Sequence, residues 1–183
     1  MYKCGLYLGR FQPLHIGHIS IIDKMLDECD HIIIAVGSAQ ESGTERNPLS
    51  FMFRSCLIEE VYSDYLDDIT ILPIRDRDAY SDDSSWGTCL FKQVSEMTLL
   101  RPTVIYEGDE VVNDHWYDEL DIPVVKVSRY RLPISGTDLR KAINSNYKNF
   151  ALEYLPTPIH KYYDEIRKEI QNAAVNSKCN PVD

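Results

Sequence analysis

Short apolar runs alternate along this chain with longer segments that carry an amphipathic pattern. The short runs are rich in β-branched residues and predict five strands, at residues 3–9, 31–37, 69–74, 103–107 and 124–127. The longer segments predict helices, at residues 18–29, 50–65, 86–100, 139–143 (opened by Ser135) and 158–174. The run at 31–37 is almost wholly apolar, which is typical of a strand covered on both faces.

Strands that alternate with helices at this spacing predict an α/β fold, a Rossmann-like, doubly wound parallel sheet with helices on both faces. The sequence shows no internal repeat and no linker, so we expect a single domain over residues 1–183, with a frayed tail at 175–183. Ligands bind such sheets at the carboxyl ends of the strands. The loops expected to meet there are those after Gly9, Gly37, Ile74 and Glu107.

Charge and cysteine usage narrow the classes of function. The chain has 29 Asp and Glu against 19 Lys and Arg, a net charge of −10, which argues against a general nucleic-acid binder. Its five cysteines form no Cys-x-x-Cys pair and are odd in number, which is typical of reduced cytosolic thiols. The longest apolar run, Ile32–Val36, is too short to cross a membrane, and the first residues lack the apolar stretch of a signal peptide. We therefore expect a cytoplasmic protein that binds neither nucleic acid nor membranes.

Two histidines stand where the first strand meets the first helix. His15 and His18 share one face if both lie in the first helical turn, and Gly17 lets a ligand approach the backbone. A helix start offers N–H groups and a positive dipole end to a phosphate, and Arg10 adds a permanent charge. The alternatives are two polar residues at a helix start, or a zinc site. No His-x-x-x-His spacing and no neighbouring cysteine or carboxylate completes a zinc site, so we expect no metal ligands from protein side chains.

A second candidate anion site opens a helix late in the chain, at Ile-Ser-Gly-Thr-Asp-Leu-Arg, residues 134–140. Ser135 and Asp138 form a capping-box pattern, which explains these two residues structurally. Thr137 and Arg140 fall on one helical face, where a hydroxyl and a guanidinium lie beside unpaired N–H groups.

Both segments resemble signatures of one superfamily. Gly-Arg-Phe-Gln-Pro-Leu-His-Ile-Gly-His at residues 9–18 resembles the His-x-Gly-His signature of the nucleotidyltransferases. Residues 134–140 resemble the superfamily's Ile-Ser-x-Thr-x-x-Arg signature, which grips the β- and γ-phosphates of ATP. The two lie about 120 residues apart in the expected order. The resemblance implies transfer of a nucleotide to a phosphorylated acceptor without a covalent enzyme intermediate.

The acceptor is suggested by the residues around these signatures. Arg10-Phe11-Gln12 resembles the archaeal-type nicotinamide-mononucleotide adenylyltransferases, including the domain that some bacteria fuse to a Nudix hydrolase. The other similar stretches are residues 37–40, 46–50, 72–76 with Trp86, and 152–166. No Nudix sequence follows, so we expect that second activity to be absent. The 76–86 loop is longer than the family's, and residues 107–110 are more acidic, so contacts in these two loops are expected to differ.

The resemblance implies three groups of site residues. The catalytic group is His15, His18, Arg46 and Arg140. The ATP-binding group is Gly9, Arg10, Phe11, Gln12, Gly17, Gly108, Ser135, Gly136 and Thr137. The group that binds nicotinamide mononucleotide is Gly37, Ser38, Asp76, Asp83 and Trp86.

Some of these residues have simpler explanations. An indole face can stack on a flat cationic ring, but Trp86 also fits a core position at a helix start. Asp76 and Asp83 are equally consistent with solvated loop carboxylates. Arg46 is either a phosphate ligand or a solvated arginine, and Arg54 is a weaker phosphate candidate.

The expected reaction is in-line attack of the 5′-phosphate of nicotinamide mononucleotide on the α-phosphorus of ATP, giving NAD and pyrophosphate. Mg²⁺ is expected to enter on the triphosphate. The residues leave open nicotinic acid mononucleotide or another sugar phosphate as acceptor, and a non-catalytic nucleotide sensor with this fold. Relatives often assemble, so we expect a homo-oligomer. The hypothesis requires the His15–His18 pair to lie beside Thr137 and Arg140.

Overall fold

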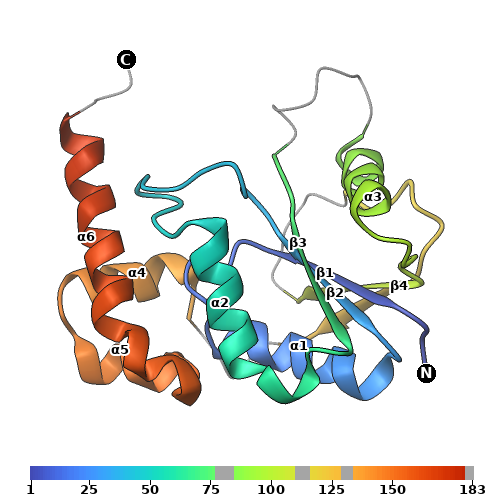
Figure 1. Cartoon of the computed structure of the whole chain (residues 1–183), viewed down its shortest axis with the longest axis horizontal. Helices are drawn as coiled ribbons and strands as arrows, with labels where there is room; N and C mark the ends of the chain where they lie inside the picture. The colour runs from blue at the N-terminus through green and yellow to red at the C-terminus, as the bar shows by residue number, and fades with distance from the viewer. Residues whose placement is uncertain (77–84, 110–115, 129–133, 180–183) are drawn as a thin grey trace.

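The computed structural model describes residues 1–76, 85–109, 116–128 and 134–179. Its centre is a parallel sheet of strand order β3-β2-β1-β4-β5, which confirms the predicted α/β class and single domain (Figure 1). The strands are β1 (Gly5–Gly9), β2 (Ile32–Val36), β3 (Ile69–Pro73), β4 (Val104–Gly108) and β5 (Val124–Val127). The central strand β1 pairs with β2 on one side and β4 on the other, so strand order reverses there and opens a crevice at the carboxyl ends.

Alternating side chains of the strands supply two apolar cores, one on each face of the sheet. In β2, Ile32 and Ile34 enter the larger core, and Ile33 and Ala35 enter the smaller one. Helices α1 (Ile16–Glu28) and α2 (Phe51–Val61) cover the larger core, and α3 (Trp86–Met97) covers the smaller core. Figure 1 shows α1 and α3 on opposite sides of the sheet. The helices therefore lie on both faces, as the alternation of elements predicts.

The remaining helices form a layer beside α2, on the side of the molecule away from α3 (Figure 1). They are α4 (Gly136–Asn144), α5 (Lys148–Tyr154) and α6 (Tyr163–Cys179), with the 3₁₀ turn η3 (Thr157–Tyr162) before α6. A shorter 3₁₀ turn, η1 (Ser63–Tyr65), follows α2. In the described part of the chain, no helix is long and apolar enough to span a bilayer.

Element boundaries differ from the sequence prediction in this last layer. Helix α5 was not predicted, because seven residues are too few to establish a periodic pattern. The predicted helix at 158–174 begins instead as a 3₁₀ turn, and α6 continues to Cys179. At the other end of the chain, α1 begins at Ile16 rather than at residue 18, since His15 caps it.

Candidate active site

The two histidines form a capping box at the start of helix α1. His15 is the N-cap: its Nδ1 accepts the Gly17 N–H at 3.1 Å, and its own N–H donates to His18 Nδ1 at 3.2 Å. The two rings lie 3.8 Å apart between centroids, and His15 is only 2% exposed. An imidazole whose Nδ1 accepts a hydrogen bond carries its proton on Nε2. The cap therefore sets both rings in the tautomer that donates from Nε2, the tautomer that suits phosphate oxygens.

Phe11 packs against the His18 ring, and Gly9 leaves room for the Phe11 ring. The Phe11 ring is fully buried and lies 4.7 Å from the His18 ring between centroids. A Cβ atom at Gly9 would come within 2.8 Å of the Phe11 ring, so only glycine leaves room for it. Phe11 itself has φ of +51°, a left-handed conformation that is unfavourable for a bulky side chain. The sequence predicted contacts to ATP for both residues, and their packing gives each a structural reason to be present.

Gln12 joins the first loop to the segment before α2. Its Nε2 donates to the Leu49 carbonyl and its Oε1 accepts the Leu49 N–H, both at 2.9 Å, and the side chain is buried. The side-chain amide is therefore used by the backbone of another loop. The backbone carbonyl of Gln12 faces the other way, toward α4.

The start of α4 lies against this same loop. Arg140 Nη1 donates to the Gln12 carbonyl at 2.8 Å, and Nη2 donates to Thr137 Oγ1 at 3.1 Å. A Cβ atom at Gly136 would lie 3.4 Å from the Gln12 carbonyl oxygen, which shows how closely the two segments approach. Ser135 caps α4 as predicted: its Oγ accepts the Asp138 N–H at 3.1 Å. The two motifs, far apart in sequence, therefore meet with their helix amino ends together.

One cavity of about 210 Å³ is shared by the two motifs. It is lined by nine of the residues predicted from the sequence: Arg10, Phe11, Gln12, His15, His18, Ser135, Gly136, Thr137 and Arg140. A neighbouring cavity of about 390 Å³ is lined by Arg10, Glu45, Arg46, Thr137 and Arg140. Arg46 thus reaches the same region from the loop before α2.

Positive charge is concentrated between these cavities. Burial lowers the pKa of the Arg10 guanidinium, and the charge of Arg46 lowers it further. Burial likewise lowers the pKa of Arg140, with a second contribution from Arg10, while Glu45 opposes the shift. Among the described residues, the Nη1 of Arg10 is buried without a hydrogen-bond partner. A buried, unsatisfied guanidinium nitrogen beside two other arginines is suited to a multivalent anion.

The residues predicted for the acceptor lie at the ends of β2 and β3. Ser38 Oγ donates to Asp76 Oδ1 at 3.0 Å, and Gln40 Nε2 donates to Asp76 Oδ2 at 2.8 Å. The Gly37 N–H donates to the Gly9 carbonyl at 2.9 Å, which joins this end of the site to the first loop. Ser38 and Asp76 are therefore brought together, as expected for residues at one edge of a parallel sheet.

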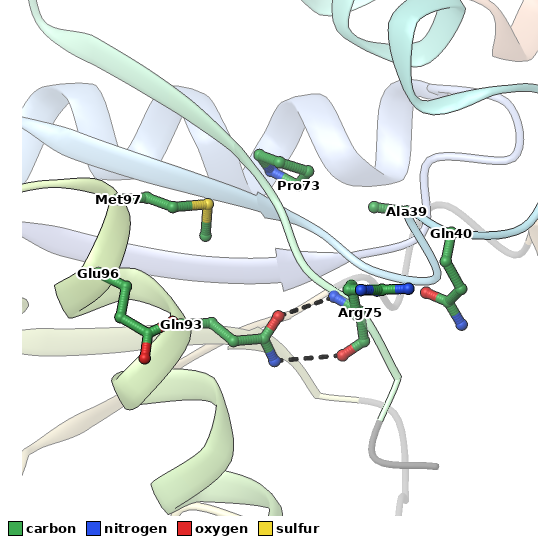
Figure 2. Close-up of a pocket in the computed structure, with 7 residues that line it drawn as sticks. All are labelled: Ala39, Gln40, Pro73, Arg75, Gln93, Glu96 and Met97. Carbon is green, nitrogen blue, oxygen red and sulfur yellow. Dashed lines mark hydrogen bonds between the residues drawn. The ribbon is translucent and has the colours of Figure 1, made fainter. Parts of the chain in front are cut away.

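A cavity of about 500 Å³ lies beside this end, between β3 and α3 (Figure 2). It is lined by Ala39, Gln40, Pro73, Arg75, Gln93, Glu96 and Met97. Gln93 is buried, and its side-chain amide accepts the Arg75 N–H at 2.9 Å and donates to the Arg75 carbonyl at 3.2 Å (Figure 2). These bonds hold the chain as it leaves β3, directly before Asp76. No pattern in the sequence distinguishes Gln93 from other helical glutamines.

The remaining predicted residues are Trp86, Asp83 and Gly108. Trp86 is the first residue of α3, half-buried and packed against the smaller core, so its packing supports the simpler explanation; ring stacking stays a prediction. Asp83 lies outside the described residues. Gly108 ends β4 opposite Val127 of β5, at the same edge of the sheet as Gly9.

The structure argues against the weak expectation that Arg54 binds a phosphate. It is completely buried, and its guanidinium donates to four backbone carbonyls, those of Arg10, Gly37, Ser38 and Ser50. Burial lowers its pKa to about 10, with the charge of Asp76 opposing the shift. Its hydrogen-bonding groups therefore serve the loops of the site and do not face a ligand.

The described residues contain no cluster of three or more His, Cys, Asp or Glu side chains that would hold a metal ion.

Comparison with known proteins shows the family. The cytidylyltransferase-like family matches residues 6–142, a span that contains both motifs. A nicotinamide-nucleotide adenylyltransferase from Methanococcus aeolicus is 32% identical over 179 residues, 95% of each chain. One from Saccharolobus solfataricus is 31% identical over 173 residues, 89% of this chain and 91% of that protein.

The fold also matches a solved structure. It is a bifunctional NMN adenylyltransferase/ADP ribose pyrophosphatase from Francisella tularensis, complexed with AMP and a manganese ion, with a TM-score of 0.74 and 22% identity. The match covers all of this chain and 57% of the Francisella chain, so this chain spans little more than half of that protein. Two converging motifs, the sheet order and the sequence matches lead to one conclusion: the chain belongs to the cytidylyltransferase-like family of nucleotidyltransferases.

Proposed function

We propose that this protein transfers the adenylyl group of ATP to nicotinamide mononucleotide, forming NAD and pyrophosphate. The observation that carries the proposal is the single cavity shared by the His15–His18 pair and the Thr137–Arg140 face of α4. In the reaction, a 5′-phosphate oxygen of the acceptor forms a new bond to the α-phosphorus of ATP. The bond from that phosphorus to the bridging oxygen breaks, and pyrophosphate leaves with the electron pair.

Each group of site residues stabilises a different phosphate in this reaction. His15 and His18 donate from Nε2 to the α-phosphate, where negative charge grows in the transition state. Thr137, Arg140 and Arg10 bind the departing pyrophosphate, and Arg46 holds the attacking phosphate. Phosphoryl chemistry needs little covalent help, so positioning and charge account for the catalysis.

The acceptor is inferred from the relatives and from the edge of the sheet. The related proteins are named nicotinamide-nucleotide adenylyltransferases, and Ser38 and Asp76 lie together at the carboxyl ends of β2 and β3. Asp76 offers a carboxylate to the acceptor's cationic ring or to its amide. The expected homo-oligomer stays a prediction that sedimentation would test.

Mg²⁺ fits this site as part of the ATP complex. Arg10, Arg46 and Arg140 line the cavity where the phosphates would bind, and the similar Francisella structure contains AMP and a manganese ion. When bound with ATP, Mg²⁺ would neutralise part of the negative charge of the triphosphate.

Pyrophosphate release is the direct test. The wild-type protein is expected to release pyrophosphate with ATP and nicotinamide mononucleotide together, and not with ATP alone. Parallel reactions with nicotinic acid mononucleotide and ribose 5-phosphate define the acceptor. Tight ATP binding without release for any acceptor would contradict the proposal and favour a nucleotide sensor.

Replacing His18 by alanine removes one of the two imidazole donors. We expect kcat to fall by roughly 10²- to 10⁴-fold while the far-ultraviolet circular dichroism stays that of the wild type. The matched control is His31→Ala, because His31 lies just before β2, at the amino edge of the sheet, where its Nε2 bonds to Thr70 Oγ1 at 3.0 Å. A normally active His18→Ala protein would refute the role given to the histidine pair.

A further inference from the structure

We propose that Arg54 is a positioning residue that fixes the ATP end of the site relative to the acceptor end. It would act through the loops that it holds, without touching either substrate. This inference rests on the proposed function and adds to it a residue that the two signature motifs do not contain.

The hydrogen bonds of Arg54 connect three separate segments. Its Nη1 donates to the Arg10 carbonyl at 2.8 Å and to the Gly37 carbonyl at 2.7 Å. Its Nη2 donates to the Ser38 carbonyl at 3.1 Å, and its Nε donates to the Ser50 carbonyl within its own helix cap at 3.3 Å. One rigid, planar group thus holds the loop after β1, the end of β2 and the start of α2 together.

The two loops held by Arg54 belong to different ends of the predicted site. Arg10 lines both phosphate cavities, so its carbonyl marks the ATP end. Ser38 bonds to Asp76, so its carbonyl marks the acceptor end. A shift of one loop against the other would change the distance between the attacking phosphate and the α-phosphate, and in-line transfer is sensitive to this distance.

Both loops need external support at these points. Phe11, which follows Arg10, has φ of +51°, and Ser38 has φ of +49°. Left-handed backbone is unfavourable for residues other than glycine and persists only where the surroundings hold it. Arg54 bonds to the carbonyl of Ser38 and to the carbonyl just before Phe11, which places the support beside the strained residues.

Lysine cannot replace the arginine in this role. Its compact ammonium keeps the charge but lacks the planar fork that reaches carbonyls on two sides at once. Arg54→Lys therefore separates the positioning role from the charge, and Arg54→Met removes both while keeping a similar length.

The test compares binding of each substrate alone with turnover of both together. For Arg54→Lys, we expect kcat to fall by about 10- to 100-fold, because the two phosphates are misaligned. Dissociation constants for ATP alone and for nicotinamide mononucleotide alone, measured by calorimetry, should stay within about threefold of the wild type. Arg54→Met should lose more turnover than Arg54→Lys. If the methionine variant does not fold, the lysine variant alone decides.

Leu57→Ala is the matched control, since Leu57 is buried on the same helix but packs in the larger core. It should lower thermal stability and leave kcat per folded molecule unchanged. The inference is overturned if folded Arg54→Lys turns over normally, if its single-substrate affinities fall as far as kcat, or if Leu57→Ala loses as much turnover. A wild-type protein without pyrophosphate release contradicts the proposed function instead, which keeps the two failures distinct.

Discussion

At the scale of single residues, the site contains two kinds of polar side chain. His18 and Thr137 line the cavity, whereas Arg54 donates all its hydrogen bonds to backbone carbonyls; Gln12 and Arg140 do both, lining the cavity and bonding to the backbone of another loop. Both kinds are polar side chains at the same edge of the sheet, so residue type alone does not separate them. The hydrogen-bond partner of each side chain separates the two kinds, and this partner is seen only in the folded chain.

Gln12→Leu tests the structural role of that side chain. The substitution leaves the buried N–H and carbonyl of Leu49 without partners, so the free energy of unfolding should fall by about 1–3 kcal/mol. Urea denaturation followed by circular dichroism measures the change. Gln40→Leu is the control, because the bonds of Gln40 to Asp76 are exposed and their loss should cost less than about 0.5 kcal/mol. Equal losses in the two variants would contradict the explanation.

At the scale of elements, the chemistry depends on where helices begin. Helix α1 starts with a histidine cap and α4 with a serine cap, and residues of both helix starts line the shared cavity. A capped helix start holds its first-turn side chains in fixed positions. Under the proposed function, we expect the cap of α4 to support ATP binding by orienting Thr137 and Arg140.

Ser135→Ala and Ser85→Ala form a matched pair for this idea. Each serine caps a helix by accepting an N–H three residues on, from Asp138 in α4 and from Thr88 in α3. Both substitutions should cost about 1 kcal/mol of stability. Only Ser135→Ala should also raise the KM for ATP, by about fivefold. A similar KM change in both variants, measured by pyrophosphate release, would contradict a specific role for the α4 cap.

At the scale of the whole molecule, two apolar cores hold the sheet between helical layers, and both cores bury ionisable groups. Burial, with a smaller effect of Cys29, raises the pKa of the Cys4 thiol from 9.0 to about 11. Burial and the neighbouring Asp23 raise the pKa of Tyr62, whose hydroxyl donates to that carboxylate at 2.8 Å. The folded state therefore holds these protons more tightly than the unfolded chain does.

These shifts predict alkaline destabilisation. The Cys4 contribution is fully present below pH 9 and is lost as the pH rises through about 11, because the unfolded thiol ionises first. The free energy of unfolding should thus decline from pH 9 upward, and the decline between 9 and 11 should be shallower in Cys4→Ala. Urea midpoints measured at pH 8, 9, 10 and 11 check this. Parallel declines in the wild type and the variant would show that Cys4 does not contribute.

The sequence by itself determined the type of most elements, the parallel sheet and the two motifs. Strand and helix periodicity is a local property of the sequence, and the motifs at residues 9–18 and 134–140 are each contiguous and short. The crevice at the carboxyl edge also follows from topology, because parallel strands all end there. For the same reason Ser38 and Asp76 were expected at one edge.

Only the tertiary structure decided which groups of the chain each polar side chain bonds to. Gln12 bonds to Leu49 across 37 residues of sequence, and Arg140 bonds to Gln12 across 128. Arg54 donates to carbonyls of loops that are separated along the chain, and Gln93 of α3 bonds to the backbone of Arg75 after β3. Such contacts leave no periodic pattern and no short motif in the sequence, since they arise from the packing of elements against one another. The convergence of α1 and α4, on which the proposed chemistry depends, belongs to this second class.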